Sequence, residues 1–124
     1  MIIGTGIDII EVQRVAEKVN KENGFREKVF SASEIIYCEK MADAAQHYAA
    51  RFAAKEAFLK ACGGGLMLGY NLSEVEIRHN DQGKPEFFLT GSFKVLAAEK
   101  GWNRIHVSLS HVQAMACAVV IIEQ

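Results

Sequence analysis

Arg51-Phe-Ala-Ala-Lys-Glu-Ala-Phe-Leu-Lys-Ala-Cys-Gly-Gly-Gly65 predicts a long helix that ends at a run of glycines. Glu56 and Lys60 are four residues apart and share one face of that helix, and Arg51 and Lys55 form a second such pair. A carboxylate among three cations beside glycines has the groups needed to hold a metal ion and phosphates. The same spacing is also typical of a solvated helix face, so the rest of the chain has to decide.

Around this stretch, hydrophobic periodicity and turn residues predict helices and strands in a definite order. The predicted helices cover residues 11–20, a short segment after Ser31 or Ser33, residues 43–62 and residues 92–100. The predicted strands cover residues 2–9, 72–78, 85–89, 105–110 and 114–122. Gly4 and Gly6 mark a kink or a close backbone approach in the first strand. The last strand is apolar on both faces, so we expect it to be central and covered on both sides. The order predicts an α+β fold in a single domain, residues 1–124, with an antiparallel sheet packed against the long helix and shorter helices.

Composition limits the classes of function. Half of the 124 residues are hydrophobic and 23% are charged, as in globular domains. The formal net charge of −1 argues against nucleic-acid binding, which usually needs a basic excess. Three cysteines without a C-x-x-C pair disfavour a disulfide framework or a zinc site and indicate a reducing compartment. No segment has the length of a membrane span, and the N-terminus does not read as a signal peptide. We therefore expect a soluble, cytoplasmic protein without nucleic-acid or membrane partners.

Three further motifs carry polar groups that need an explanation. Asp8, in Gly6-Ile-Asp8, interrupts an apolar strand, either to cap the following helix or to bind a cation. Gly83-Lys84-Pro85 lies at a predicted hairpin turn. Ser108-Leu-Ser110-His111 lies at the end of a strand, where adjacent side chains point to opposite faces. A serine hydrolase is therefore disfavoured, and the chain has no G-x-S-x-G motif.

In this order, the four motifs resemble those of the 4′-phosphopantetheinyl transferase family, in particular its short branch, the holo-acyl-carrier-protein synthases. The resemblance covers essentially the whole chain. The Gly6-x-Asp8 element and the Lys55-Glu56-Ala-x-x-Lys60-Ala helix are its most specific parts. The Gly-Lys-Pro turn and the Ser-x-Ser-His element support it.

The resemblance implies transfer of 4′-phosphopantetheine from coenzyme A to a serine of an apo acyl carrier protein in fatty acid biosynthesis, with release of adenosine 3′,5′-bisphosphate. Asp8 and Glu56 are then the expected ligands of Mg²⁺, which prefers carboxylate and phosphate oxygens. Asp8, Glu56 and Lys60 are the expected catalytic residues, and either Glu56 or a magnesium-bound water that it orients accepts the serine proton. The expected contacts to coenzyme A come from charged, small and ring-bearing residues in all four motifs: Arg51, Lys60, Gly63, Gly65, Lys84, Pro85, Ser110 and His111.

The order of the motifs also implies an assembly. Longer, two-lobed family members carry the Gly-Lys-Pro and Ser-x-Ser-His elements before the Gly-x-Asp and Lys-Glu elements, whereas here Gly-x-Asp comes first in a chain half as long. A single copy resembles one lobe. The resemblance therefore implies a homotrimer with sites at subunit interfaces, where Lys84 and His111 of one subunit face Asp8, Glu56 and Lys60 of a neighbour.

The chain departs from the longer family members at one position of the first strand. Longer members place a second carboxylate two residues after the Gly-x-Asp aspartate, where this chain has Ile10, so a water is expected to replace that ligand.

An acidic carrier protein is expected to contact Arg14, Lys18 and Lys21, which lie roughly on one side of the first helix. A solvated helix face is the alternative, since Glu17 and Glu22 dilute the positive charge.

Two other classes of function remain open on the sequence alone. A different coenzyme A enzyme, such as an acyltransferase, would leave coenzyme A intact as a thiol and would not need Asp8 and Glu56. An inert oligomeric binding module would not need Lys60 beside them. Phosphopantetheine gained by a carrier protein in the presence of magnesium separates the transferase from both.

Overall fold

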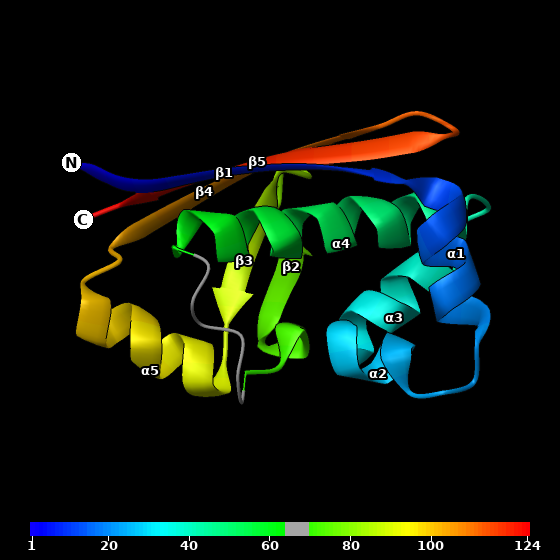
Figure 1. Ribbon diagram of the computed structural model, residues 1–124, viewed down its shortest axis with the longest axis horizontal. Coiled ribbons are helices and arrows are strands. Elements are labelled where there is room, and N and C mark those ends of the chain that lie inside the picture. The colour runs from blue at the N-terminus through cyan, green and yellow to red at the C-terminus, as the bar shows by residue number, and fades with distance from the viewer. Residues whose placement is uncertain (64–69) are drawn as a thin grey trace.

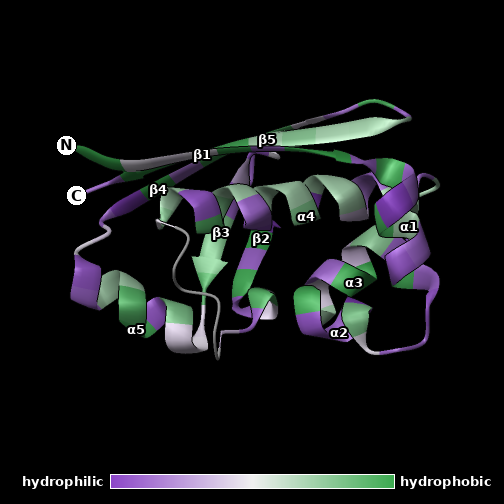
Figure 2. Ribbon diagram, in the orientation of Figure 1, coloured by the Kyte–Doolittle hydropathy of each residue, from purple (hydrophilic) through white to green (hydrophobic). Residues whose placement is uncertain are grey.

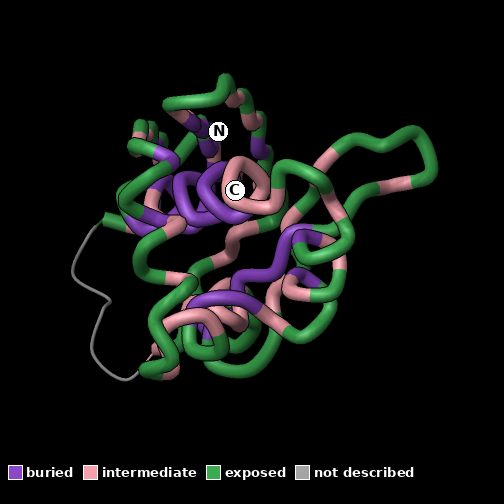
Figure 3. Tube along the Cα trace, turned by 90° about the vertical axis from the view of Figure 1, so that its right-hand side faces the viewer, coloured by how far each residue is buried: buried purple, intermediate pink, exposed green. Residues whose placement is uncertain are grey.

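Helix α4 (Ala44–Ala61) runs through the middle of the molecule, with one sheet on either side of it (Figure 1). The structure is a computed structural model that describes residues 1–63 and 70–124. Residues 48–55 of α4 are buried without a break, so this helix has no solvent face in its middle, and the buried part of the trace follows it (Figure 3). A helix buried all round needs small residues, and its alanines supply them.

The larger sheet has the strand order β1-β5-β4, with both pairs antiparallel. It is formed by β1 (Ile2–Glu11), β5 (Met115–Glu123) and β4 (Arg104–His111). The second sheet is an antiparallel hairpin of β2 (Val75–His79) and β3 (Pro85–Leu89). The predicted α+β fold, with an antiparallel sheet on a long helix, is confirmed.

The remaining helices lie at the two ends of α4. Near its N-terminal end are α1 (Val12–Asn20), α2 (Phe25–Val29) and α3 (Ala32–Glu39), and near its C-terminal end is α5 (Gly91–Lys100) (Figure 1). Helix α3 starts with a capping box, in which the Ser31 side chain accepts from the Glu34 amide and the Glu34 carboxylate accepts from the Ser31 amide. Helix α2 was not predicted from the sequence, because one turn of five residues is too short to show helical periodicity.

The predicted strand from residue 72 begins later than expected. Leu72–Glu74 forms a 3-10 turn, and β2 starts at Val75. The reason is a buried cation, since Lys55 Nζ donates to the carbonyl oxygens of Leu72 and Val75, both at 2.9 Å. Turning both carbonyls toward one ammonium group is incompatible with an extended backbone there.

Gly4 and Gly6 mark a close approach between β1 and α4, one of the two possibilities that the sequence left open. A Cβ at Gly6 would lie 2.9 Å from the Ala57 carbonyl carbon and from the Ala61 amide, and closer still to the Ala57 carbonyl oxygen. Backbone atoms cannot move aside as a flexible side chain does. These glycines therefore bring the inner face of β1 onto α4, including the position two residues beyond Gly6.

The closing strand β5 is central in its sheet, as predicted, but only one of its faces is covered within a single chain. Ala116, Ala118 and Val120 face α4 and are buried. On the other face Val119 is 39% exposed, beside Ile7 of β1 at 68%. Hydrophobic residues lie along these strands (Figure 2). Among the described residues, no helix has the length and apolar character required to cross a bilayer.

Candidate active site

Asp8, Glu56 and Lys60 meet where β1 crosses α4. Asp8 follows Gly6 on the inner face of β1, so the close approach at Gly6 brings its carboxylate to the helix. Lys60 Nζ lies 3.1 Å from Asp8 Oδ1 and donates to the Ile7 carbonyl oxygen at 2.9 Å. The structure therefore brings together three residues predicted to be catalytic, from segments about fifty positions apart.

The electrostatics of this cluster favour a bound cation. Burial raises the pKa of Glu56 above its ordinary value, and the nearby charge of Asp8 raises it further, against the opposing effect of Lys60 and Lys18. Two carboxylates that repel one another are a ready binding site for a hard cation.

The donor set also matches the requirements of magnesium. Within residues 1–63 and 70–124, no group of three or more histidine, cysteine or acidic side chains could hold a metal ion. Magnesium usually takes one or two protein carboxylates and fills its other positions with water and phosphate oxygens. Asp8 and Glu56 fit that pattern, with the remaining ligands left to a phosphate-bearing substrate.

Two cations of α1 border the same site. A pocket of about 470 Å³ is lined by Asp8 and Glu56 together with Arg14 and Lys18. The Lys18 ammonium lies 5.7 Å from the centres of two phenylalanine rings, which hold it at the edge of this pocket. Lys21, predicted to act with them, lines a different pocket. The predicted docking surface is thus divided, with Arg14 and Lys18 next to the acidic pair.

Arg51 lies in a second pocket, of about 360 Å³, away from the acidic pair. Its guanidinium carbon lies 4.3 Å above the ring of Tyr37, which in turn stacks on His79 at 4.9 Å. Burial lowers the pKa of His79, and the positive charge of Arg51 lowers it further. Arg51 Nε is buried and has no hydrogen-bond partner among the described residues. A pocket with an unpaired guanidinium donor and stacked rings suits a phosphate and a heteroaromatic base.

His111 lies at the end of β4, and its ring contacts that of His47, which in turn contacts Tyr37 of the second pocket. The two imidazole rings meet edge to face at 5.3 Å, and His47 meets Tyr37 at 5.7 Å. The Nδ1 atom of His111 lies 2.8 Å from Gln46 Oε1. Ser110 is exposed on the outer face of the larger sheet.

The remaining predicted contacts lie elsewhere. Lys84 and Pro85 line a third pocket, of about 260 Å³, together with Arg104 and His106. Gly63 has a φ of +102°, and among residues 1–63 and 70–124 no atom lies within 4 Å of where a Cβ would be placed. Gly65 lies outside the described residues.

Among the residues that the structure describes, the three pockets share no lining residue. A single chain therefore brings the predicted catalytic residues together but does not bring them to Arg51 and His111, or to Lys84 and Pro85.

The sequence did not separate the roles of Arg51 and Lys55, and it missed Tyr37, His47 and His79. Lys55 is fully buried and bonds to Glu34, so only Arg51 of the pair lines a pocket. The three missed residues come from α3, α4 and β2, and no spacing in the sequence indicates that they converge.

Comparisons with known proteins identify the family and the fold. A family model described as the 4′-phosphopantetheinyl transferase superfamily matches residues 4–120. The holo-[acyl-carrier-protein] synthase of Syntrophus aciditrophicus is 45% identical over 124 residues, covering 99% of this chain and 97% of that protein. The crystal structure of the synthase from Neisseria meningitidis superposes with a TM-score of 0.90 at 31% identity over 100% of both chains. The Bacillus anthracis synthase, in complex with CoA (3′,5′-ADP), gives a TM-score of 0.78 at 31% identity, covering 98% of this chain and 96% of that one.

Proposed function

This chain belongs to the 4′-phosphopantetheinyl transferase superfamily, and we propose that it is the enzyme that transfers 4′-phosphopantetheine from coenzyme A to a serine of an apo acyl carrier protein. The products are the holo carrier protein and adenosine 3′,5′-bisphosphate. The pathway it serves is fatty acid biosynthesis, in the cytoplasm. The single observation that carries the proposal is the convergence of Asp8, Glu56 and Lys60 at one pocket.

The roles of these residues follow from their positions. The serine oxygen attacks the β-phosphorus of the coenzyme A pyrophosphate, and the bond from that phosphorus to the oxygen of adenosine 3′,5′-bisphosphate breaks. Glu56 accepts the serine proton, either directly or through a water that it orients. Lys60, whose side chain is 57% exposed, stabilises negative charge on the pyrophosphate as the bond breaks.

Magnesium held by Asp8 and Glu56 would neutralise charge on the pyrophosphate and on the leaving phosphate. Lys60 pairs with Asp8 at 3.1 Å, beside the position proposed for the ion.

The nucleotide end of coenzyme A is assigned to the second and third pockets. The buried Arg51 donor and His111 would contact the 3′-phosphate, with Ser110 at the same strand end. Lys84 and Pro85 would contact the adenosine. Gly63 and Gly65 would leave space for the pyrophosphate.

We place these pockets in one active site through a homotrimer. The three pockets are separate within one chain, and the outer face of the larger sheet exposes Ile7, Ile9 and Val119. Apolar side chains at this density are typical of an interface between subunits. A second copy on this face would add its Arg51, His111 and Lys84 to the Asp8–Glu56 pair.

The activity is tested by incubating the protein with coenzyme A, magnesium and an apo acyl carrier protein, followed by intact-protein mass spectrometry. The carrier is expected to gain the mass of one phosphopantetheine, and the gain is expected to disappear with a chelator. No gain in mass would overturn the proposed function and would favour a coenzyme A acyltransferase or an inert binding module.

Two inactive variants are expected to restore activity when they share a trimer. Glu56→Gln removes the acidic half of a site and His111→Ala the nucleotide half. In every trimer that contains both variants, both halves would then be intact in about one third of the interface sites. Co-expressed variants, separated as mixed trimers by two affinity tags, are assayed at low coenzyme A concentration. If each site lies within one chain, no activity returns.

Arg14→Glu is expected to raise the KM for the apo carrier protein about tenfold or more, because it reverses a charge that would face an acidic partner beside the acceptor serine. The KM for coenzyme A and the magnesium dependence should stay unchanged. Lys94→Glu, the same kind of charge reversal on the exposed face of α5, is the matched control. An equal effect from both variants would mean that net charge, and not a docking surface, determines carrier affinity.

A further inference from the structure

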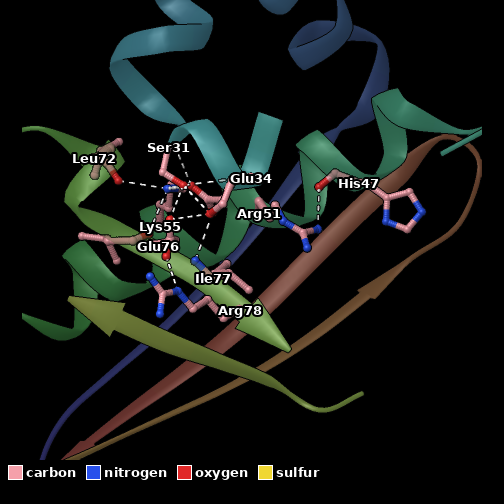
Figure 4. Close-up of polar contacts among 11 residues, drawn as sticks. Ser31, Glu34, His47, Arg51, Lys55, Leu72, Glu76, Ile77 and Arg78 are labelled. Atoms are coloured by element: carbon pink, nitrogen blue, oxygen red, sulfur yellow. Dashed lines mark hydrogen bonds and ion pairs between the residues drawn. The ribbon is translucent and has the colours of Figure 1, made fainter. Parts of the chain in front are cut away.

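A fully buried ion pair between Glu34 and Lys55 lies under the Arg51 pocket (Figure 4). Lys55 Nζ donates to Glu34 Oε1 at 2.7 Å and to the carbonyl oxygens of Leu72 and Val75. Neither side chain of the pair is exposed. All three ammonium protons are therefore used within the protein, and none is available to a phosphate.

Glu34 is shared among three segments of the chain. Its Oε1 atom also accepts from the Ser31 amide at 2.9 Å, and its Oε2 atom accepts from the Ile77 amide at 3.1 Å. One carboxylate thus joins the N-terminus of α3, the middle of α4 and strand β2. The hydroxyl groups of Ser31 and Ser33 donate to Glu76, which adds a second link between α3 and β2.

The same three elements supply the side chains of the Arg51 pocket. Tyr37 lies three residues after Glu34 on α3, and Arg51 lies four residues before Lys55 on α4. His79 follows Ile77 by two residues, on β2. Tyr37 and Arg51 are therefore one helical turn from a member of the buried pair, and His79 is one strand repeat from Ile77, whose amide bonds to Glu34.

The stacked arrangement of the pocket depends on how these elements are held. The Arg51 guanidinium rests on the Tyr37 ring, and that ring rests on His79. Helix α3 is open to solvent on one side, where Ile36 is 68% exposed, and Glu34 and Cys38 are its buried residues. A small movement of α3 would separate Tyr37 from both partners.

A buried ion pair is a poor source of net stability, because removing two charges from water offsets most of their attraction. Its directional bonds nevertheless fix the relative positions of the segments that it joins. We propose that Glu34 and Lys55 are positioning residues that hold Tyr37, Arg51 and His79 in the arrangement that binds the nucleotide end of coenzyme A. This inference rests on the proposed function.

The test uses the double variant Glu34→Gln/Lys55→Met in the full-length protein. It removes both buried charges at once, keeps an acceptor for the Ser31 amide and leaves the net charge of the chain unchanged. Any loss of phosphate binding therefore cannot come from a change in overall charge. Leu96→Ala, a buried truncation in α5, serves as the matched control for lost stability.

Binding of adenosine 3′,5′-bisphosphate is measured by calorimetry, below the unfolding temperature of each protein. The double variant is expected to bind about tenfold more weakly or worse, the effect of losing one hydrogen bond to a charged phosphate. Its KM for coenzyme A should rise in parallel, while kcat at saturating coenzyme A stays within about twofold of wild type. Leu96→Ala should change neither constant.

The outcomes separate this inference from the proposed function. If wild type neither transfers phosphopantetheine nor binds the bisphosphate, the proposed function fails. If wild type does both and the double variant matches it, or loses kcat with KM unchanged, the positioning role is wrong.

If the double variant does not fold, bisphosphate binding is measured with the Tyr37→Leu variant instead. It breaks the stack without touching the ion pair, and it must weaken bisphosphate binding for the positioning role to stand.

Discussion

Glu56→Gln is expected to lower phosphopantetheine transfer by about 10²–10⁴-fold at saturating magnesium and coenzyme A, the range that a general base contributes. The same variant is expected to be more stable than wild type when no metal is present. The two effects have one cause. Glu56 is half-buried next to Asp8, which suits cation binding and proton transfer but disfavours the charged carboxylate in the folded state.

The sign of the stability effect follows from proton linkage. The pKa of Glu56 is raised in the folded protein, so the folded state holds this proton more tightly than the unfolded chain. Stability therefore falls as pH rises from the ordinary carboxyl value through the raised one. Glutamine cannot ionise, and the variant avoids this penalty.

Thermal unfolding with and without magnesium measures the second effect. Added magnesium should raise the Tm of wild type and leave that of Glu56→Gln nearly unchanged, because only a folded state that binds the ion gains stability. Glu99→Gln, the same change at an exposed position of α5, is the control and should alter neither activity nor Tm. Full turnover by Glu56→Gln would exclude Glu56 as an essential ligand or base.

Gly6→Ala is expected to destabilise the protein by several kcal/mol or to prevent folding, although it adds a single methyl group. The new Cβ would lie 2.9 Å from the carbonyl carbon of Ala57 and from the amide of Ala61. Overpacking usually costs about 1–3 kcal/mol where side chains adjust, and here the obstacle is helix backbone, which does not. The strand would have to move off α4, and Asp8 would move with it.

Denaturant unfolding and the yield of soluble protein measure this effect. Thr5→Val, an isosteric change at the neighbouring position on the outer face of β1, is the control and should fold normally. If Gly6→Ala matched wild type in stability and in activity, the close approach of β1 to α4 would not be what places Asp8.

Much of the fold was predictable because its signals are local. The end of α4 at the glycine run, the serine cap of α3 and the strand after Pro85 each depend on a few neighbouring residues. The Gly6-x-Asp8 pattern even placed a glycine and a carboxylate on the same strand face. Helix α2 and the turn at Leu72 escaped prediction, the first because it is short and the second because a distant lysine causes it.

The charges of α4 show what local signals cannot convey. Along the chain Arg51, Lys55, Glu56 and Lys60 read as two equivalent pairs on one helix. In the folded protein Lys55 forms a buried ion pair with Glu34, and Arg51 lies over the Tyr37 ring. Glu56 and Lys60 lie next to Asp8. The local pattern was enough to make this segment a helix with two charged pairs. Which of these side chains is structural and which belongs to a site depends on burial and on partner groups that come from other elements, and only tertiary packing supplies those.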